Sequence, residues 1–282
     1  MSDPSFAGKT AVITGAGGTL GSAVARELAR LGARVALLGR TAGPLRAVAD
    51  AIAAAGGSAL AVPVDVTDLD AVAAARVAIA GGLGPCDLLV NAAGGNQPDA
   101  VTGTTEFDPA EIAEEGGDVR GFFHLDLARF RDVIEANTMG TVIPCQVFGR
   151  VLAGRGRGAI VNFASMNSYR PLSRVPAYGM AKAGIANFTQ WLAAYLAPAG
   201  VRVNAVAPGF FLNDRSRKIL LDDAGGLTAR GQNILAHTPL RRFGEPGDLL
   251  GCVCWLLDDA RAGFVTGITV PVDGGFLASS GV

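Results

Sequence analysis

Short apolar segments alternate with helical segments along most of the chain, and this alternation constrains the fold more than any other feature. The short segments are rich in Val, Ile, Leu and Ala, without the polar alternation of a half-exposed strand. Such runs are typical of strands buried on both faces of a parallel sheet. The sequence therefore predicts one doubly wound α/β domain over residues 1–282. The predicted strands are residues 10–14, 34–39, 59–64, 87–91, 159–163, 202–206 and 268–272.

Apolar side chains recur with the period of a helix between these strands. Leu20, Val24, Leu28 and Leu31 lie on one helix face, and Gly32 ends that helix. Further helices are predicted over residues 69–81, 127–152, 177–196 and 245–257.

Two segments interrupt the rhythm, residues 95–126 and 210–239. Both follow the carboxyl ends of predicted strands, where α/β sheets bind their ligands. Loops of this length in a compact domain are usually functional or disordered. We therefore expect both segments to form walls of a substrate pocket.

Composition and charge exclude several classes of protein. The chain is 50% hydrophobic and 17% charged, which excludes an intrinsically disordered protein. Its net charge of -1 gives no reason to expect nucleic acid or an anionic membrane as partner. The longest charge-free stretch, residues 183–201, contains Asn, Thr, Gln, Pro and Gly, so we expect a buried helix and no membrane span.

The N-terminus and the cysteines indicate a cytoplasmic protein. The first residues contain an acid and lack the basic and apolar regions of a secretory signal. The four cysteines lack the spacing of a zinc site, so no metal is expected. We expect four reduced thiols, most of them buried.

A glycine-rich turn joins the first predicted strand to the first helix. Glycines let the backbone approach a pyrophosphate, and the helix N-terminus stabilises its charge. The turn lacks the Gly-Lys-Ser/Thr ending of a P-loop. It predicts a dinucleotide site, and the alternative is a tight turn with packing glycines. The expected cofactor contacts are Gly15, Gly17, Gly18, Thr19, Leu20 and Gly21.

The ends of the next strands indicate which dinucleotide is bound. An acid after the second strand would bind the ribose hydroxyls of NAD, but the chain has Arg40 near this position. Arg40 can pair with a 2′-phosphate, which favours NADP(H); the alternative is NAD(H) with a solvated Arg40. Asp65 would accept from the adenine amino group or cap the next helix. Further contacts are expected from Val66, Asn91, Ala92, Ala93 and Gly94.

Tyr178 and Lys182 are four residues apart and share one face of a predicted helix. A nearby ammonium favours the phenolate and lowers the tyrosine pKa from its free value of about 10. The pair can then exchange a proton with an alcohol or carbonyl oxygen while a hydride moves. Ser165 follows the fifth strand, and its hydroxyl can hold the substrate oxygen.

With these residues in place, the chain resembles the short-chain dehydrogenase/reductase family from Lys9 to Gly275. The resemblance implies a seven-stranded parallel Rossmann sheet, a nicotinamide cofactor and a catalytic tetrad. In it Tyr178 would be the acid/base, Lys182 would hold the nicotinamide ribose and tune Tyr178, and Ser165 would orient the reacting oxygen. Asn137 would hold a water in a proton relay, or else kink or cap its helix. The motifs that carry the resemblance are residues 14–21, 65, 91–94, 137, 165, 178–182, 208–209 and 273–275.

The resemblance also implies nicotinamide contacts and an assembly. Pro208, Gly209, Phe211 and Asn213 would line the nicotinamide pocket, and the helices around Asn137 and Tyr178 would meet their symmetry mates in a homotetramer. The family usually has Gly at Thr19 and Ser at Ala164, and commonly Thr at Asn213. None of these departures removes a catalytic group, and the Asn213 amide can still hydrogen-bond.

Several segments look like one branch of the family, the D-mannonate oxidoreductases, or fructuronate reductases, of the short-chain type. This resemblance implies interconversion of D-mannonate and D-fructuronate. A sugar acid requires a cation for its carboxylate and polar partners for its hydroxyls. His124 and His237 are expected to be pocket or structural residues, because the Tyr–Lys pair makes another acid/base unnecessary. The segments are residues 92–99, 165–172, 187–192, 207–212 and 237–246, and the expected substrate contacts are Asn96, Gln97, Asn167, Arg170 and Arg174.

Two other functions stay open at this point. One is the same reaction on another substrate: a gluconate or ketogluconate polyol, or an acyl or steroid ketone. A pocket for an acyl or steroid ketone should be mainly apolar, which Asn96, Gln97 and Asn167 argue against. The other is a dinucleotide sensor without activity, which the intact Tyr178 and Lys182 argue against.

Overall fold

The computed structural model describes residues 5–112 and 120–279. Over these residues one seven-stranded sheet forms in the order β3-β2-β1-β4-β5-β6-β7, with every pair parallel. The predicted fold class, a single doubly wound α/β domain, is confirmed. The strands are β1 (Thr10–Thr14), β2 (Arg34–Gly39), β3 (Ser58–Pro63), β4 (Leu88–Asn91), β5 (Gly158–Phe163), β6 (Val201–Pro208) and β7 (Thr269–Val272).

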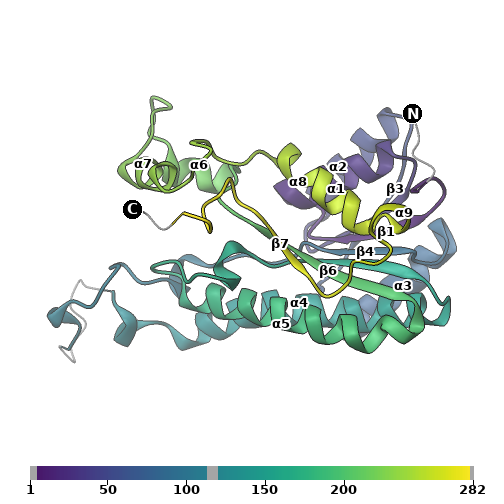
Figure 1. The fold of residues 1–282 in the computed structure, drawn as a ribbon, viewed down its shortest axis with the longest axis horizontal. Helices are drawn as coiled ribbons and strands as arrows, with labels where there is room; N and C mark the ends of the chain where they lie inside the picture. The colour runs from purple at the N-terminus through teal and green to yellow at the C-terminus, as the bar shows by residue number, and fades with distance from the viewer. Residues whose placement is uncertain (1–4, 113–119, 280–282) are drawn as a thin grey trace.

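Helices cover both faces of the sheet, as Figure 1 shows. One face packs against α1 (Thr19–Arg30), α2 (Ala42–Ala54) and α8 (Pro246–Leu257), and a short α9 (Asp259–Ala262) follows α8. The other face packs against α3 (Leu69–Leu83), α4 (Leu127–Gly154) and α5 (Pro176–Leu196). The strand order reverses between β1 and β4, which is the point where such sheets bind ligands.

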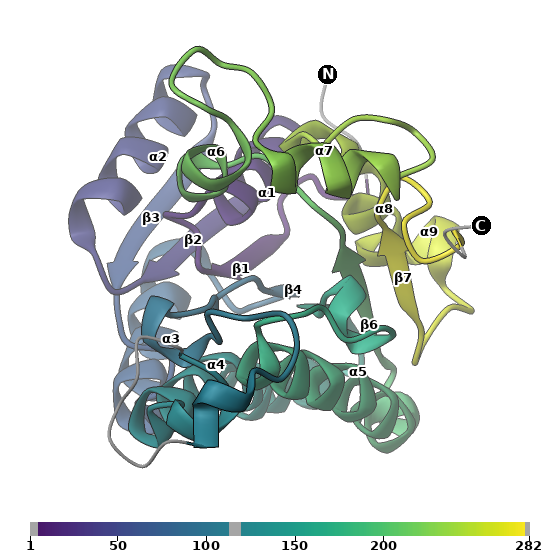
Figure 2. The same ribbon diagram turned by 90° about the vertical axis from the view of Figure 1, so that its left-hand side faces the viewer.

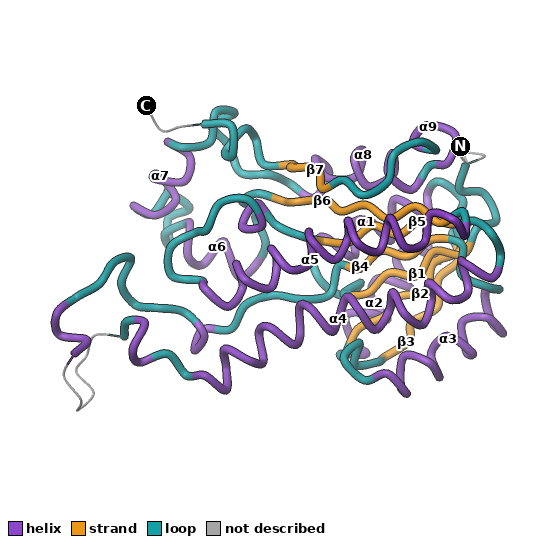
Figure 3. The backbone as a smooth tube through the Cα atoms, turned by 60° about the horizontal axis from the view of Figure 1, so that its bottom comes forward, coloured by secondary structure: helices purple, strands orange, loops and turns teal. Residues whose placement is uncertain are grey.

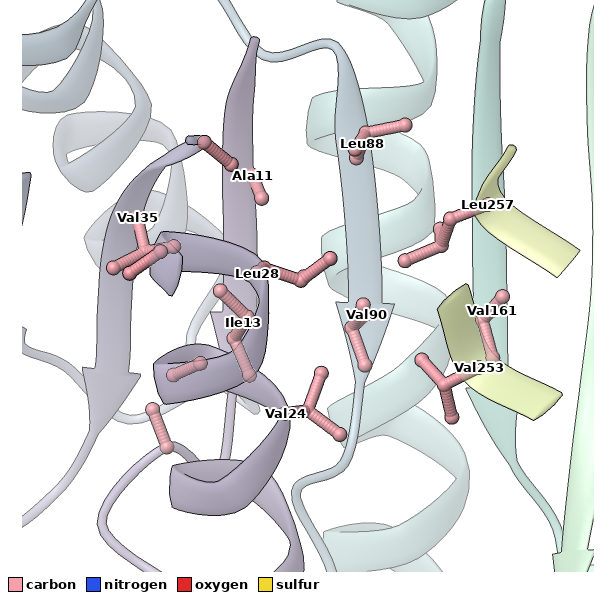
Figure 4. Close-up of a cluster of buried hydrophobic side chains, with 14 of the residues drawn as sticks. Ala11, Ile13, Val24, Leu28, Val35, Leu88, Val90, Val161, Val253 and Leu257 are labelled. Carbon is pink, nitrogen blue, oxygen red and sulfur yellow. The ribbon is translucent and has the colours of Figure 1, made fainter. Parts of the chain in front are cut away.

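The core between the sheet and the first helix layer consists of branched aliphatic side chains. Figure 4 shows Val24 and Leu28 of α1 against Ile13, with Val253 and Leu257 of α8 further along the sheet. All five side chains are at most 1% exposed. Side chains of this size each contribute about 1.5–3 kcal/mol when they are fully buried, so this layer fixes the first helix against the sheet.

Three expectations about the elements were incomplete or wrong. The helix α2 was not predicted, although Leu45, Val48 and Ile52 are buried on one face of it. The strands β3 and β7 were expected to be buried on both faces, but most of their residues are half-exposed. Both strands lie at an edge of the sheet, where fewer neighbours cover them.

The two segments that interrupt the rhythm project from the carboxyl ends of the strands, on the same side of the molecule (Figures 1 and 2). The first carries three short 3₁₀ turns, η1 (Pro98–Ala100), η2 (Pro109–Ile112) and η3 (Phe122–His124); residues 113–119 lie outside the described residues. The second, residues 210–239, is called the lid below. It was expected as a loop but contains α6 (Asp214–Leu220) and α7 (Ala229–Ala236) (Figure 3). These helices are short, and they share a small core of Leu220, Ile234 and Phe243.

The charge-free stretch, residues 183–201, forms most of α5 and is only partly buried within one chain, although a buried helix was expected. Its inner face, including Ala181 and Ile185, packs on the sheet side. Its outer face leaves Met180, Trp191 and Tyr195 exposed. Among the described residues, no helix has the length and apolar character needed to cross a membrane.

Candidate active site

The end of β5 and the start of α5 bring Ser165, Tyr178 and Lys182 together. Ser165 caps the 3₁₀ turn η4 (Met166–Ser168), with its Oγ accepting from the Asn167 amide at 3.2 Å. A hydrogen bond links its side chain to Tyr178. The Nζ of Lys182 lies 5.6 Å from the centre of the Tyr178 ring. The predicted trio therefore forms one cluster at the carboxyl edge of the sheet.

Lys182 is anchored in an apolar setting. Its side chain is 4% exposed, and Nζ donates to the Phe163 carbonyl at 2.7 Å. Burial disfavours the ammonium and lowers the pKa of Lys182 to about 7. The amine can therefore gain and lose a proton near neutral pH.

Tyr178 does not show the lowered pKa that the sequence predicted. Burial raises the pKa of Tyr178 above its usual value, and the hydrogen bond with Ser165 opposes this only in part. The prediction was wrong for this structure because desolvation of the phenolate exceeds the stabilisation from its neighbours. Tyr178 is thus a phenol at neutral pH, which is the form that donates a proton.

Asn137 binds protein backbone with both ends of its side-chain amide. Its Nδ2 donates to the Gly95 carbonyl at 2.7 Å and to the Val133 carbonyl at 2.8 Å. Its Oδ1 accepts from the Gly95 amide at 3.1 Å. The side chain is fully buried in α4 and clamps the loop that follows β4. The amide hydrogens of Asn137 are therefore used within the protein, and a water relay would have to engage another atom of this residue.

Gly94 allows the chain to pass between Asn137 and Lys182. Its φ of 139° is one that other residues rarely adopt. A Cβ at this position would overlap Oδ1 of Asn137 and lie 3.5 Å from Nζ of Lys182. The packing of Asn137 and Lys182 therefore requires glycine at this position in the loop after β4.

The glycine-rich turn has the geometry of a dinucleotide cradle. Gly15 has a φ of 65°, and a Cβ there would lie 2.6 Å from the Ala92 carbonyl oxygen. A Cβ on Gly21 would overlap the Gly15 carbonyl, so α1 can pack this closely only with glycine. In this described stretch, α1 has no acid in its first turn and no side chain capping its N-terminus. Its amide groups remain available to an anion, so these residues fit a nicotinamide dinucleotide. A groove beside the turn is lined by Gly17, Gly18 and Thr19, and Leu20 follows in the helix.

The ends of β2 and β3 lie side by side in the sheet, and each carries a predicted cofactor residue. Arg40 is exposed, and its charge contributes to lowering the pKa of Asp65 after the larger effect of hydrogen bonds from Thr67. The alternative role of Asp65 as a helix cap is not observed. Asp68 caps α3 instead, accepting from the Ala71 amide at 2.9 Å.

The segment that ends β4 approaches the glycine turn through its backbone. The Ala93 amide donates to Oγ1 of Thr14 at 3.1 Å, which ties this segment to β1. The Ala92 carbonyl lies close to Gly15. The Asn91 side chain points into the protein and donates to Oδ1 of Asn162 at 2.9 Å. Val66 is buried at 7% exposure in the core beneath α3, so its side chain packs there.

The residues expected at the nicotinamide follow β6. Gly209 passes so close to the C-terminal loop that a Cβ would lie 2.7 Å from Cα of Asp273, and Pro208 ends the strand before it. The Phe211 side chain is 8% exposed and belongs to the core cluster on the α1 side of the sheet. Asn213 precedes the first helix of the lid, and its Oδ1 accepts from the Ser216 amide at 2.9 Å.

The expected substrate residues differ in their surroundings. The side-chain Oδ1 of Asn167 accepts from the Leu172 amide at 2.7 Å and closes its own loop. The Arg170 guanidinium donates to backbone carbonyls of Ser279 and Leu277 and holds the C-terminal segment. The Nε of Arg174 donates to the Thr102 carbonyl at 2.8 Å. Asn96 is half-exposed and Gln97 exposed at the start of the first projecting segment.

The two histidines take structural positions. Nδ1 of His237 lies 2.8 Å from the Asn233 carbonyl at the end of α7. His124 is half-exposed in η3, and its buried Nδ1 finds no hydrogen-bond partner among residues 5–112 and 120–279. In the part of the chain that the structure describes, no three His, Cys, Asp or Glu side chains gather as metal ligands.

A buried polar ladder under the site was not predicted. Nδ2 of Asn162 donates to Oγ1 of Thr189 at 3.0 Å, and Thr189 donates to the Ile185 carbonyl at 2.8 Å. Together with Asn91 these residues connect β4, β5 and α5. An asparagine within an otherwise apolar strand segment was the available signal, because a buried amide requires partners.

Comparisons with known proteins agree with this geometry. The profile of the short-chain dehydrogenase family matches residues 9–223. The uncharacterized oxidoreductase UxuB of Bacillus subtilis (strain 168) is 50% identical over 277 residues, covering 98% of both chains.

Solved structures match over the same length. A candidate D-mannonate oxidoreductase from Haemophilus influenza with bound NAD superimposes with a TM-score of 0.92 at 40% identity, covering 100% of this chain and 98% of that one. A candidate NAD(P)-dependent gluconate 5-dehydrogenase from Beutenbergia cavernae, with NADP at low occupancy, has a TM-score of 0.79 at 35% identity and covers 97% and 98% of the two chains. With its parallel sheet, glycine cradle and Ser–Tyr–Lys cluster, the protein belongs to the short-chain dehydrogenase family and is an NAD(P)-dependent oxidoreductase.

Proposed function

We propose that this enzyme interconverts D-fructuronate and D-mannonate, with NADP(H) as the favoured cofactor. The substrate assignment rests on one observation. The chain matches the candidate D-mannonate oxidoreductase over its whole length, including both projecting segments. Polar side chains such as Asn96 and Gln97, in the segment that follows Gly94 and Gly95, suit a substrate rich in hydroxyls. The relative that resembles a gluconate 5-dehydrogenase makes a ketogluconate the second candidate substrate.

The mechanism follows from the protonation states of the cluster. In the reducing direction, a bound dihydronicotinamide supplies a hydride to the carbonyl carbon. Tyr178, a phenol at neutral pH, gives its proton to the carbonyl oxygen, and Ser165 holds that oxygen in place. Lys182, with a pKa of about 7, lies beside the Tyr178 ring and in this proposal helps to restore the phenol proton. In this proposal Asn137 is a positioning residue, because it clamps Gly95 beside the cluster.

Arg40 supports the cofactor preference. It is exposed at the end of β2, where an acid would otherwise bind the ribose hydroxyls of NAD. A guanidinium there can form a bidentate contact with the 2′-phosphate of NADP. NAD(H) remains the alternative cofactor, bound without this contact.

An activity panel tests the proposal. We expect NADPH-dependent reduction of D-fructuronate to have the highest kcat/KM among D-fructuronate, 5-keto-D-gluconate, D-fructose, a 3-oxoacyl thioester and a steroid ketone, with NADH less effective. Absorbance of the reduced cofactor measures each rate. Turnover of the acyl or steroid ketone with none of the sugar acids would refute the substrate and leave the reaction class intact.

We also propose that the enzyme is a homotetramer that uses the outer face of α5. Phe188, Trp191 and Tyr195 stack along this face, with ring centroids 6.1 Å and 5.1 Å apart. Trp191 is 57% and Tyr195 68% exposed. Exposed aromatic side chains in a contiguous row are typical of a protein interface.

Light scattering tests the assembly. We expect the mass of a tetramer for the unaltered enzyme. We expect a smaller mass for Trp191→Arg, because the substitution places a charge among the aromatic side chains of the proposed interface. Val77→Arg is the control, since Val77 is 61% exposed on α3 away from this row. A monomeric mass for the unaltered enzyme would contradict the proposal.

We propose a cytoplasmic location on the basis of the four cysteine thiols. Cys86 and Cys145 are buried, Cys252 and Cys254 are half-buried, and within the described residues none of the four forms a disulfide. Reduced thiols are the state that the cytosol maintains.

A further inference from the structure

A positively charged cleft lies at the amino edge of the sheet, opposite the active site. Strand β1 begins directly after Lys9, β2 begins at Arg34, and β5 begins directly after Arg157. All strands are parallel, so their first residues meet at one edge, while the two projecting segments lie at the other (Figure 1). Together with Arg155, at the end of α4, these side chains line a cleft of about 350 Å³. A volume of this size suits a small ligand.

Two acids also line the cleft, Asp87 and Asp259, and each is already bound by cations of the protein. Oδ1 of Asp87 accepts from Nη2 of Arg155 at 2.8 Å. Oδ1 of Asp259 accepts from Nη2 of Arg202 at 2.7 Å, and its Oδ2 lies 3.5 Å from Nζ of Lys9. Both carboxylates are therefore engaged by cations other than the two remaining arginines of the cleft.

Those two arginines, Arg34 and Arg157, have no acidic partner within residues 5–112 and 120–279. Nη2 of Arg34 donates to a neutral acceptor, the Gly8 carbonyl, at 2.7 Å. The Arg157 side chain is exposed and forms no hydrogen bond or ion pair with any residue that the structure describes. Four cationic and two acidic side chains thus line the cleft, which leaves it with two more positive than negative charges.

The cleft also contains unused hydrogen-bond donors. The Nε atoms of Arg34 and Arg155 are both buried, and neither finds an acceptor in the described part of the chain. Buried donors without a partner are rare, and a bound water or ion is a common explanation. Charge and hydrogen bonding therefore both favour an anion in this cleft.

We propose that Arg34, Arg155 and Arg157 bind a phosphate group here, either inorganic phosphate or the monoester of a small molecule. A phosphate monoester carries a charge of about -1.5 to -2 at neutral pH and three strong acceptor oxygens, which matches the excess positive charge. A carboxylate supplies one charge and two oxygens. Guanidinium groups suit phosphate because their paired N–H groups form bidentate hydrogen bonds. The site is separate from the active site and does not depend on the substrate proposed above.

Isothermal titration calorimetry of the enzyme saturated with reduced nicotinamide cofactor tests the proposal, because the cofactor excludes phosphate from the dinucleotide site. We expect inorganic phosphate to bind the unaltered enzyme at one site per chain. Arg157→Gln should raise its Kd by about 10-fold or more, because a hydrogen bond to a charged group is lost. Combining Lys9→Gln with Arg157→Gln should abolish measurable binding, since the excess positive charge is then removed.

Two further ligands define the chemistry of the site. A lower Kd for D-glucose 6-phosphate than for inorganic phosphate would assign the cleft to phosphate esters, and an equal or higher Kd would assign it to inorganic phosphate; both results support a phosphate site. Acetate should bind about 10-fold more weakly than phosphate, because it has one charge and fewer acceptor oxygens. Equal affinities for acetate and phosphate would contradict the proposal.

Arg217→Gln is the matched control. Arg217 is exposed on α6, in the lid at the carboxyl side of the sheet, and the substitution removes the same group. Its Kd for phosphate should equal that of the unaltered enzyme. An equal rise in Kd for Arg217→Gln and Arg157→Gln would overturn the site, because phosphate would then respond only to the net charge of the protein. An unchanged Kd for Arg157→Gln, or no phosphate binding by the unaltered enzyme, would overturn it as well.

Discussion

Tyr178→Phe should lower kcat by about 10²–10⁴-fold, because the substitution removes the proton donor and leaves the ring in place. Cofactor affinity should be unchanged, since the phenol hydroxyl is not part of the glycine cradle. Steady-state rates with the best substrate of the panel measure the first effect. A fluorescence titration with reduced cofactor measures the second.

The same helix provides the control for this experiment. Tyr195→Phe makes the identical change on the outer face of α5, where the ring stacks on Trp191 and the hydroxyl is away from the cluster. It should retain full turnover. Turnover retained by Tyr178→Phe would contradict the assignment of Tyr178 as the acid.

The raised pKa of Tyr178 also sets the pH dependence of the two directions. The phenol is the form needed for reduction, and it persists throughout the neutral range because burial holds the pKa above its usual value. Oxidation requires the phenolate, so its rate should rise with pH across the same range. A maximum for oxidation below neutral pH would be inconsistent with this.

Lys182→Met should change how the stability of the protein depends on pH. Burial lowers the pKa of Lys182 from 10.5 to about 7 in the folded state. Between these two values the unfolded chain binds one more proton than the folded one, so the free energy of unfolding rises with pH. The cost of burying this amine is fully present below pH 7 and is lost as the pH rises toward 10.5.

We therefore expect the unaltered protein to gain up to about 1.4 kcal/mol per pH unit relative to Lys182→Met within this window. Urea denaturation at several pH values from neutral to alkaline measures the difference. Lys218→Met is the control, because the exposed Lys218 should give parallel curves. Parallel curves for Lys182→Met as well would show that the Lys182 amine titrates near its ordinary pKa in the folded protein.

Much of the fold could be predicted from the sequence because its strands are buried. The β1 and β2 segments were predicted to the residue, since apolar runs bounded by turns mark such strands clearly. The lid helices α6 and α7 were missed. They are seven and eight residues long, too short to show a helical period, and they depend on packing against each other.

The site residues also fall into those that the sequence predicted and those that it did not. Ser165, Tyr178 and Lys182 were found because their spacing is local and their chemistry is distinctive. The protonation state of the cluster was not predicted, because the pKa of Tyr178 depends on burial by residues distant in the sequence. Asn167 and Arg170 were expected to contact substrate, but they bind backbone in their own surroundings.

The small core shared by Leu220, Ile234 and Phe243 has a consequence for how this enzyme can change over evolution. The lid draws its cohesion from these side chains, which are separate from the clusters that hold the sheet and its main helices together. Substitutions on its exposed surface, such as those at Lys218, leave both sets of contacts intact. A lineage can therefore explore new substrates by altering the lid while the hydride-transfer machinery stays constant. One scaffold can in this way diversify across many sugars and sugar acids.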